Sequence, residues 1–300
     1  PLLMAGLPAW LLGINSVRNY LASVCAKRHG QPSALMQERY RTFDEFGFDA
    51  KTVGFLQLPL LWASQGNTIA AAFWTLFYVS RDPAIQKAVI DEWSQVCASY
   101  KQEMEQSGQP VTPAGLYGSQ NVRKLRVLDS CIQEAMRLKM SSIIMRLALK
   151  DTTLLLNSQP PNAESSTAGE RRTVAVRKGD HVCLFPQFNH FDPSVFANPT
   201  QFVYDRFLTT DGSTKKFYSA AGTELRHAFI PFGGGSSMCP GRFFAVNEMK
   251  LLVLNLLARF EFAVDSNVPE PPVDLARLGL GMQQPLQDVP FRFRLRSIAA

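Results

Sequence analysis

The sequence predicts a mostly α-helical protein with small β-sheets, an α+β protein of the irregular kind. Apolar residues recur at helical spacing over long stretches, at 53–80, 81–104, 122–138 and 240–260. Runs of β-forming residues are few and short, and they lie in the second half of the chain. Strands do not alternate with helices as in a βαβ protein, and no internal repeat is visible, so a doubly wound parallel sheet is not expected.

Composition narrows the classes of protein further. The chain has 300 residues, of which 46% are hydrophobic, enough for a large core. Its five cysteines are odd in number and widely spaced, so neither a disulfide framework nor a zinc ribbon is indicated, and a reducing, cytosol-facing compartment fits best. The net charge of +6 comes from scattered basic residues, which does not indicate nucleic-acid binding. A first residue of Pro1 indicates a mature segment or a piece of a longer chain.

The first half of the chain contains three predicted segments. The apolar stretch 1–13 is too short to span a bilayer and is interpreted as buried or membrane-dipping. Residues 53–80 carry no charge, and we expect one long helix through the protein centre, because lipid would tolerate the polar residues 64–68 poorly. The pair Asp82-Pro83 is typical of a helix start, and the Gly/Pro-rich stretch 107–120 is predicted to be a loop.

The second half mixes helices and strands. A helix is expected over 122–138, and strands are expected at 146–156 and 172–185, the latter folded into a hairpin by a turn at Lys178-Gly179-Asp180. Residues 157–172 have the composition of a flexible insert. After Pro186 the chain is expected to be irregular until Pro240, which begins an apolar helix, and the tail 291–297 alternates as a half-exposed strand does.

The stretch FGGGSSMCPGR, residues 232–242, carries the clearest chemistry. A cysteine before a helix N-terminus favours a thiolate, which can attack a substrate or bind a metal. A nucleophile needs a base, and no motif places His227, the histidine nearest in sequence, for that role. Haem iron needs only one protein sulfur, and glycines let the backbone pass close to a flat macrocycle. A buried structural thiol is the bland alternative, and a phosphate loop is less well supported because no G-K-[ST] follows.

The spacing F-x-x-G-x-x-x-C-x-G resembles the haem-thiolate signature of cytochrome P450 enzymes. The resemblance implies that Cys239 is the axial ligand of the iron of haem b, with Phe232, Gly233, Gly235 and Gly241 around the cofactor. The family also carries an E-x-x-R pair upstream, matched by Glu134 and Arg137, and an arginine that locks it, matched by Arg206. The implied architecture is a single haem-thiolate domain over residues 1–300, with the N-terminal part of the family's fold absent.

Two departures from the family pattern are informative. Where most members read A-G-x-[DE]-T-T on the helix over the haem, residues 63–68 read ASQGNT, so that Gly66 and Asn67 replace the acid and the first threonine, with Thr68 next to them. The resemblance makes these three the catalytic residues, while the usual proton relay is put in doubt. The family's usual arginine two residues before the cysteine is Ser237 here, and Arg146 is its expected substitute at the haem propionates.

Matches along nearly the whole chain are similar to the branch that holds sterol 7α- and 12α-hydroxylases and prostacyclin synthase. This resemblance implies a monooxygenase that hydroxylates a sterol or similar lipid, using dioxygen and electrons from NADPH through NADPH–cytochrome P450 reductase. It also implies an endoplasmic reticulum membrane location facing the cytosol, with residues 1–10 at the membrane surface. The apolar residues expected to place the substrate are Ile143, Ile144, Leu280 and Met282, and the basic residues that could meet an acidic electron donor are Lys215, Lys216 and Arg242.

Two alternatives stay open at this point. The first is a haem-thiolate isomerase of a lipid endoperoxide, of the prostacyclin synthase type, which needs no electrons and which the Gly66-Asn67 pair would suit. The second is a truncated, inactive haem protein or a lipid-binding remnant, because a chain without the front half of the fold would hold haem less well.

Overall fold

The structure is a computed structural model that describes residues 7–27, 31–156, 172–211, 213, 215–219 and 222–296. Residues 1–6 of the apolar opening segment lie outside this part, as does the predicted flexible insert 157–172 apart from Arg172. The chain divides into an N-terminal unit, residues 1–69, and a C-terminal unit, residues 70–300. Among the described residues, no helix is both long and apolar enough to cross a bilayer.

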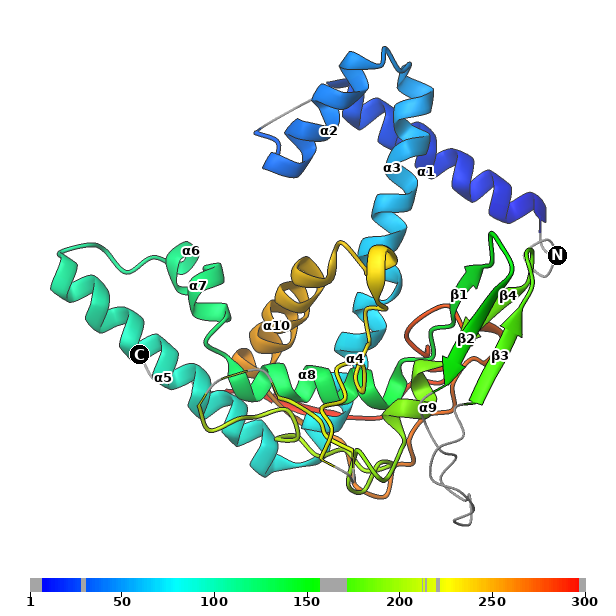
Figure 1. The fold of residues 1–300 in the computed structure, drawn as a ribbon. Helices are drawn as coiled ribbons and strands as arrows, with labels where there is room; N and C mark the ends of the chain where they lie inside the picture. Colours follow the sequence, from blue (N-terminus) through cyan, green and yellow to red (C-terminus); the bar gives the residue numbers. More distant parts are fainter. Residues whose placement is uncertain are drawn as a thin grey trace. The chain divides into compact units, whose positions relative to one another are not determined.

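Three helices make up the described N-terminal unit: α1 (Leu7–Lys27), α2 (Ala34–Glu45) and α3 (Ala50–Gly66) (Figure 1). Polar side chains start the second and third helices. The Ser33 hydroxyl accepts a hydrogen bond from the Met36 amide, and the Asp49 carboxylate accepts one from the Thr52 amide at 2.7 Å. Such caps satisfy amides that have no partner within the helix, and they define where α2 and α3 begin.

Close backbone approach holds α1 against α3. A Cβ atom at Gly54 would lie 2.4 Å from the carbonyl oxygen of Arg18, so only glycine allows this contact. From α2, the Arg39 guanidinium donates to the Gln57 side-chain oxygen at 2.9 Å and to the Leu56 carbonyl at 2.8 Å. These contacts tie the three helices of the N-terminal unit together.

The prediction of one continuous helix over 53–80 is wrong. The structure has two helices there, α3 and α4 (Thr68–Arg81), and Asn67 between them is the C-terminal cap of α3. Glycine and asparagine are poor helix formers, which explains a break at Gly66-Asn67. Burial also differs along the predicted helix, because Trp74 of α4 is fully buried whereas Trp62 of α3 is 61% exposed.

The main core of the C-terminal unit lies among α4, α5 (Pro83–Ser107), α8 (Arg126–Lys139) and α10 (Arg242–Arg259). Asp82 caps α5 as predicted, and Gly108 ends that helix in the left-handed region at φ +64°. The predicted loop 107–120 contains the short helix α6 (Pro113–Leu116) and leads into α7 (Ser119–Val122). Fully buried core side chains include those of Trp74, Val89, Leu128, Ile132, Leu254 and Leu257.

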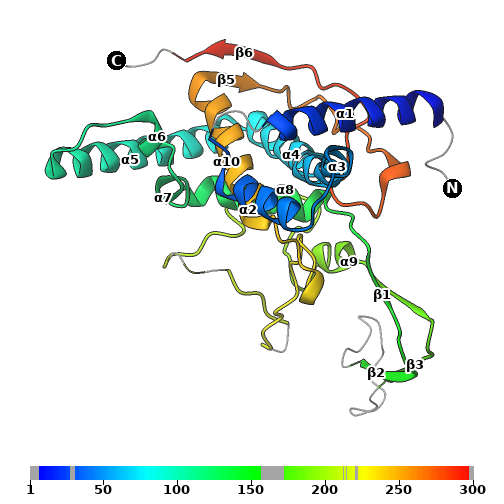
Figure 2. The ribbon, with the colours of Figure 1, turned by 90° about the horizontal axis from the view of Figure 1, so that it is seen from above.

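A bent two-stranded ribbon follows α8. Strand β1 (Ile144–Leu147) pairs antiparallel with β4 (His181–Leu184), and β2 (Thr152–Leu156) pairs antiparallel with β3 (Arg172–Val176). Figures 1 and 2 show the ribbon at one end of α8 and helix α7 at the other.

The predicted hairpin between β3 and β4 is therefore wrong. Each of these strands pairs with the earlier arm of the ribbon and not with the other. At the Lys178–Asp180 turn, the Gly179 amide donates to the Ala148 carbonyl at 2.8 Å and the Lys178 amide donates to the Asp151 carboxylate at 2.7 Å. The turn is a bend shared by both arms of the ribbon, because two of its backbone amides, those of Lys178 and Gly179, donate to the earlier arm.

The remaining elements complete the C-terminal unit. Within the stretch expected to be irregular, Pro186 starts a short helix, α9 (Pro186–His190). Helix α10 begins at Arg242, two residues after the predicted start at Pro240, since Gly241 is its N-terminal cap. Strand β5 (Phe260–Ala263) pairs with the predicted tail strand β6 (Arg292–Leu295), whose four residues are all exposed. Two 3-10 turns, η2 (Gly235–Ser237) and η3 (Leu275–Arg277), lie before and after α10.

Candidate haem site

Cys239 lies at the end of a closed loop that precedes α10. The Cys239 amide donates to the Phe232 carbonyl at 2.9 Å, which brings the two ends of the loop together. Inside the loop, the Gly233 amide donates to the Ile230 carbonyl at 3.1 Å and the Met238 amide donates to the Gly235 carbonyl at 3.2 Å. The cysteine is partly exposed. Backbone hydrogen bonds therefore hold the residue that carries the sulfur while leaving it accessible.

Two glycines of this loop adopt the left-handed backbone conformation, Gly233 at φ +74° and Gly235 at φ +65°. A Cβ atom on Gly235 would meet nothing within 4 Å, and one on Gly233 would meet only the Ser237 carbonyl, at 3.9 Å. Protein packing thus does not demand glycine here, but the backbone conformation does. The loop is bare on this side, as a surface for a flat macrocycle would be.

The donor set fits haem better than a metal held by protein ligands alone. Among the described residues, no group of three or more His, Cys, Asp or Glu side chains could hold a metal ion. Haem iron takes four ligands from the porphyrin and needs a single axial sulfur from the protein. Cys239 supplies one thiol, and exposed apolar residues flank it, with Met238 40% and Phe243 71% exposed. The residues present therefore fit a haem group.

Phe232 and Gly241 occupy different positions around this loop. The ring of Phe232 packs against the main core of the C-terminal unit, and its carbonyl oxygen holds the Cys239 amide. A Cβ atom on Gly241 would lie 3.9 Å from the Cys239 sulfur, so the glycine keeps the immediate surroundings of the sulfur open.

Arg146 reaches the cysteine loop from strand β1. One of its guanidinium nitrogens, Nη2, donates to the Gly234 carbonyl at 3.2 Å, and Nη1 donates to the Met145 carbonyl at 2.9 Å. The structure thus brings Arg146 to the cysteine loop, almost ninety residues away in the sequence, while its contact with the haem propionates stays a prediction. The exposed guanidinium can meet an anionic group beside the loop.

Glu134 and Arg137 form a fully buried ion pair on α8. The Arg137 Nε donates to Glu134 Oε2 and its Nη2 donates to Oε1, both at 2.8 Å. Both side chains are 0% exposed. Residues three apart share one face of a helix, so α8 itself presents the pair to the core.

Arg206 completes this cluster from the irregular segment after α9. Its Nε lies 3.0 Å from both carboxylate oxygens of Glu134, and the Val203 amide donates to Oε1 at 3.0 Å. One carboxylate therefore faces two guanidinium groups. Burial of such charges destabilises a fold unless each charge is paired and hydrogen-bonded. Here the pairing joins α8 to residues 203–206.

The remaining donors of Arg137 go to backbone carbonyls. Its Nη1 donates to the carbonyls of His190 at 2.6 Å and Pro199 at 2.7 Å, and its Nη2 donates to that of Gln201 at 3.3 Å. These bonds fix an irregular segment of more than ten residues onto one buried side chain. Segments without regular structure need such partners for their backbone groups.

His190 is a buried polar residue whose role the sequence did not indicate. It ends α9, it is 0% exposed, and its Nε2 accepts a hydrogen bond from the Ile230 amide at 3.3 Å. Burial, together with the nearby positive charge of Arg137, lowers the pKa of His190 to about 4. The imidazole is therefore neutral near physiological pH. The available signal was the motif His190-x-Asp192-Pro193, but sequence alone does not show its burial.

The three predicted oxygen-side residues lie at the junction of α3 and α4. Gly66 ends α3, Asn67 caps it, and Thr68 is the buried first residue of α4. They belong to the N-terminal unit, whereas the loop of Cys239 belongs to the C-terminal unit. Their catalytic roles remain predictions.

The predicted substrate residues are only partly brought together. Ile143 is 42% exposed and packs on residue 279, where a Cβ atom would lie 2.9 Å from its side chain. Ile144 starts β1, Leu280 is 62% exposed, and Met282 is 3% exposed within the main core. Ile143 and Leu280 therefore offer apolar surface, whereas Met282 is a packing residue in this structure. Their contact with a substrate remains a prediction.

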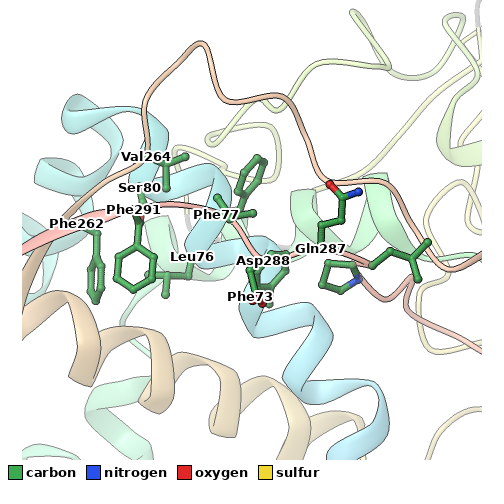
Figure 3. A pocket seen from close by; sticks show the side chains of 12 residues that line it. Phe73, Leu76, Phe77, Ser80, Phe262, Val264, Gln287, Asp288 and Phe291 are labelled. Atoms are coloured by element: carbon green, nitrogen blue, oxygen red, sulfur yellow. The ribbon is translucent and has the colours of Figure 1, made fainter.

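A separate cavity of about 560 Å³ lies between α4, β5 and the segment that leads to β6 (Figure 3). It is mostly apolar, and none of the residues lining it is a predicted site residue. Its lining includes Phe73, Phe77, Phe262, Val264, Leu286 and Phe291. The cavity is therefore not the cysteine site.

Comparison with known proteins agrees with the geometry. The Cytochrome P450 family model matches residues 32–291. The chain is 37% identical over 306 residues to "Cytochrome P450 7A1" of Rattus norvegicus, covering 99% of this chain and 57% of that protein. It is 39% identical over 241 residues to "7-alpha-hydroxycholest-4-en-3-one 12-alpha-hydroxylase" of Oryctolagus cuniculus, covering 80% of this chain and 44% of that protein.

A third relative is "25-hydroxycholesterol 7-alpha-hydroxylase" of Rattus norvegicus, 35% identical over 88% of this chain and 59% of that protein. The chain thus spans about half the length of the curated relatives it matches. The expected resemblance to the sterol hydroxylase branch is confirmed, as is the mostly α-helical fold with small sheets. The chain belongs to the cytochrome P450 family, whose cofactor is haem b.

Proposed function

We propose that this chain forms part of a single haem-thiolate monooxygenase domain that hydroxylates a sterol, with Cys239 as the axial ligand of the haem iron. The observation that carries the proposal is the loop of residues 232–241, which presents one accessible cysteine on bare, left-handed backbone. The sterol hydroxylases among the relatives support the reaction class.

Residues of the C-terminal unit would hold the cofactor. Haem, when bound, would supply the dioxygen chemistry of the family, and a cysteine thiolate would hold its iron. Cys239 provides that thiolate, Gly233 and Gly235 let the backbone lie against the macrocycle, and Phe232 closes the loop through its carbonyl. Arg146 carries the positive charge for the acidic groups of the cofactor, in place of an arginine at Ser237.

Gly66, Asn67 and Thr68 would serve the oxygen side of the site. An asparagine amide and a threonine hydroxyl can each orient a water molecule, although neither matches the acid that the family usually carries there. We expect Asn67→Ala to leave haem bound but to lower the yield of product per NADPH consumed. Gln65→Ala, a neighbouring polar substitution, is the matched control. Unchanged coupling in Asn67→Ala would refute this role.

The proposal extends to the substrate, the electron donor and the location. The names of two of the relatives described above specify hydroxylated sterols, so we propose a sterol substrate contacted by the apolar residues Ile143, Ile144 and Leu280. Electrons would come from NADPH through a reductase that docks near basic residues, including Lys215 and Lys216. The protein would act at the cytosolic face of the endoplasmic reticulum membrane.

The test is turnover of a sterol panel with NADPH and a cytochrome P450 reductase, read as a product that has gained one oxygen atom from dioxygen. We expect hydroxylation that depends on both the reductase and Cys239. Conversion of a lipid endoperoxide without electrons, in the absence of any sterol hydroxylation, would favour the isomerase alternative instead. A chain that binds haem but turns over neither substrate would favour an inactive haem protein.

A further inference from the structure

His190 lies between the buried ion cluster on α8 and the segment that leads to Cys239. Its carbonyl oxygen accepts a hydrogen bond from Arg137 Nη1 at 2.6 Å. Its imidazole Nε2 accepts one from the Ile230 amide at 3.3 Å, and its ring lies 5.3 Å from that of Phe229. The backbone and the side chain of this one residue therefore contact two different parts of the fold.

The hydrogen bonds continue from Ile230 to the cysteine. The Ile230 carbonyl accepts from the Gly233 amide, and the carbonyl of Phe232, two residues after Ile230, accepts from the Cys239 amide. Cys239 is thus connected to the Glu134–Arg137 pair through an unbroken series of short segments and hydrogen bonds. His190 is the side chain within this series that bonds the segment before the loop.

Burying an imidazole at this position lowers the stability of the fold, which indicates that the hydrogen bond accepted by its Nε2 atom has a role. Because Nε2 accepts a hydrogen bond, the proton of the neutral ring must reside on Nδ1. Nδ1 is buried, and among the described residues it has no hydrogen-bond partner. A phenylalanine or leucine would fill similar space without leaving a polar atom unsatisfied. Filling space in the core therefore does not explain a histidine at position 190.

We propose that His190 is a positioning residue for Cys239: its ring holds the Ile230 amide and thereby fixes the segment whose far end carries the sulfur. This role presupposes the haem-thiolate site proposed above. His190 does not contact the cysteine itself, so it acts through the main chain of residues 230–239. Without the Ile230 hydrogen bond, the loop samples positions in which the sulfur is displaced from the place of the iron.

Two variants separate the acceptor from the volume. His190→Phe keeps a planar ring but has no acceptor, whereas His190→Gln places an amide oxygen near the position of Nε2. The control is Phe217→Leu, which loosens the neighbouring aromatic cluster, where the Phe217 ring pairs with those of Phe196 and Phe207. If His190→Phe does not fold, His190→Asn replaces it, because its oxygen falls near Nδ1 and not near Nε2.

Backbone amide hydrogen exchange reads the proposed link without any dependence on haem chemistry. We expect the Ile230 and Gly233 amides to exchange about five- to tenfold faster in His190→Phe than in the wild type, as the loss of one hydrogen bond implies. His190→Gln should restore most of the protection, and Phe217→Leu should not affect these amides selectively. Equal exchange in His190→Phe and Phe217→Leu would overturn the link.

The ferrous carbon monoxide spectrum of the haem-loaded protein reads the position of the sulfur. We expect His190→Phe to raise the ratio of thiol-ligated to thiolate-ligated haem about five- to tenfold, with recovery in His190→Gln. A thiolate band that His190→Phe leaves at its wild-type share would overturn the positioning role alone. A wild-type protein without the thiolate band would overturn the proposed function, and this role with it.

Discussion

Replacement of Glu134 by glutamine tests how the buried ion cluster supports the fold. In the wild type the carboxylate accepts hydrogen bonds from Arg137, Arg206 and the Val203 amide, and it is 0% exposed. Glutamine keeps the shape of the side chain but removes the negative charge, and it turns one acceptor into a donor that faces guanidinium groups. Two buried positive charges then lose their counter-ion.

The size of the expected loss of stability follows from the burial of the ion pair. Removing one partner of a buried ion pair costs about 3–5 kcal/mol, because the remaining charge stays desolvated. The matched control is Glu261→Gln, which breaks another carboxylate–arginine pair, that with Arg294, whose side chains are 41% and 76% exposed. An exposed pair of this kind contributes less than about 1 kcal/mol. The two variants remove the same chemical group from very different surroundings.

Urea denaturation measures both losses as changes in the free energy of unfolding, with tryptophan fluorescence as the signal, since Trp74 lies in the core. We expect the loss in Glu134→Gln to exceed that in Glu261→Gln by at least about 2 kcal/mol. The loss in Glu134→Gln should also depend little on salt, because a buried pair is weakly screened. Equal losses in the two variants would refute the view that the cluster locks residues 190–206 onto α8.

Three further outcomes are expected. The pKa of His190 is lowered from 6.5 to about 4. The stabilisation that comes from keeping this residue neutral is therefore complete above pH 6.5, and the free energy of unfolding falls by about 3 kcal/mol as the pH drops toward 4. Urea denaturation at several pH values in this range should show this fall in the wild type and a smaller fall in His190→Gln. The Glu92 carboxylate of α5 accepts a hydrogen bond from the Val127 amide at 2.8 Å, at the start of α8. Glu92→Ala should therefore lower the free energy of unfolding by about 1–2 kcal/mol in the same assay, whereas Glu103→Ala, at an exposed position, should leave it nearly unchanged. Gly235→Ala forces a left-handed alanine and should cost about 1–2 kcal/mol, whereas Gly234→Ala, at φ −154° with open space around it, should be nearly neutral; equal effects would contradict the conformational argument.

Local signals in the sequence predicted the helices well. The Asp82-Pro83 pair predicted the start of α5, because a capping carboxylate and a proline at the first helical position act within a few residues. The helical spacing of Leu128, Ile132 and Ala135 predicted α8 and its buried face in the same way. The break at Asn67 was missed, since a uniformly uncharged stretch hides an interruption of a single residue.

Pairings between residues far apart in the sequence could not be predicted from such local signals. The turn at Gly179 was predicted, but its partner strands were not, because paired residues are 34 to 40 positions apart in β1 and β4 and 16 to 24 positions apart in β2 and β3. Glu134 and Arg206 were expected to meet only through the family resemblance. His190 was missed altogether, because its burial arises from the irregular segments around it and not from any periodicity.

The central claim is that Cys239 is the thiolate ligand of a haem iron, and the reduced carbon monoxide difference spectrum of the haem-loaded protein tests it most directly. Cys183→Ala, which removes an exposed thiol on β4, is the matched control for Cys239→Ala. The wild type and Cys183→Ala should both show the band of thiolate-ligated haem, and Cys239→Ala should lack it. A thiolate band that survives in Cys239→Ala, or a haem-loaded wild type without one, would contradict the account.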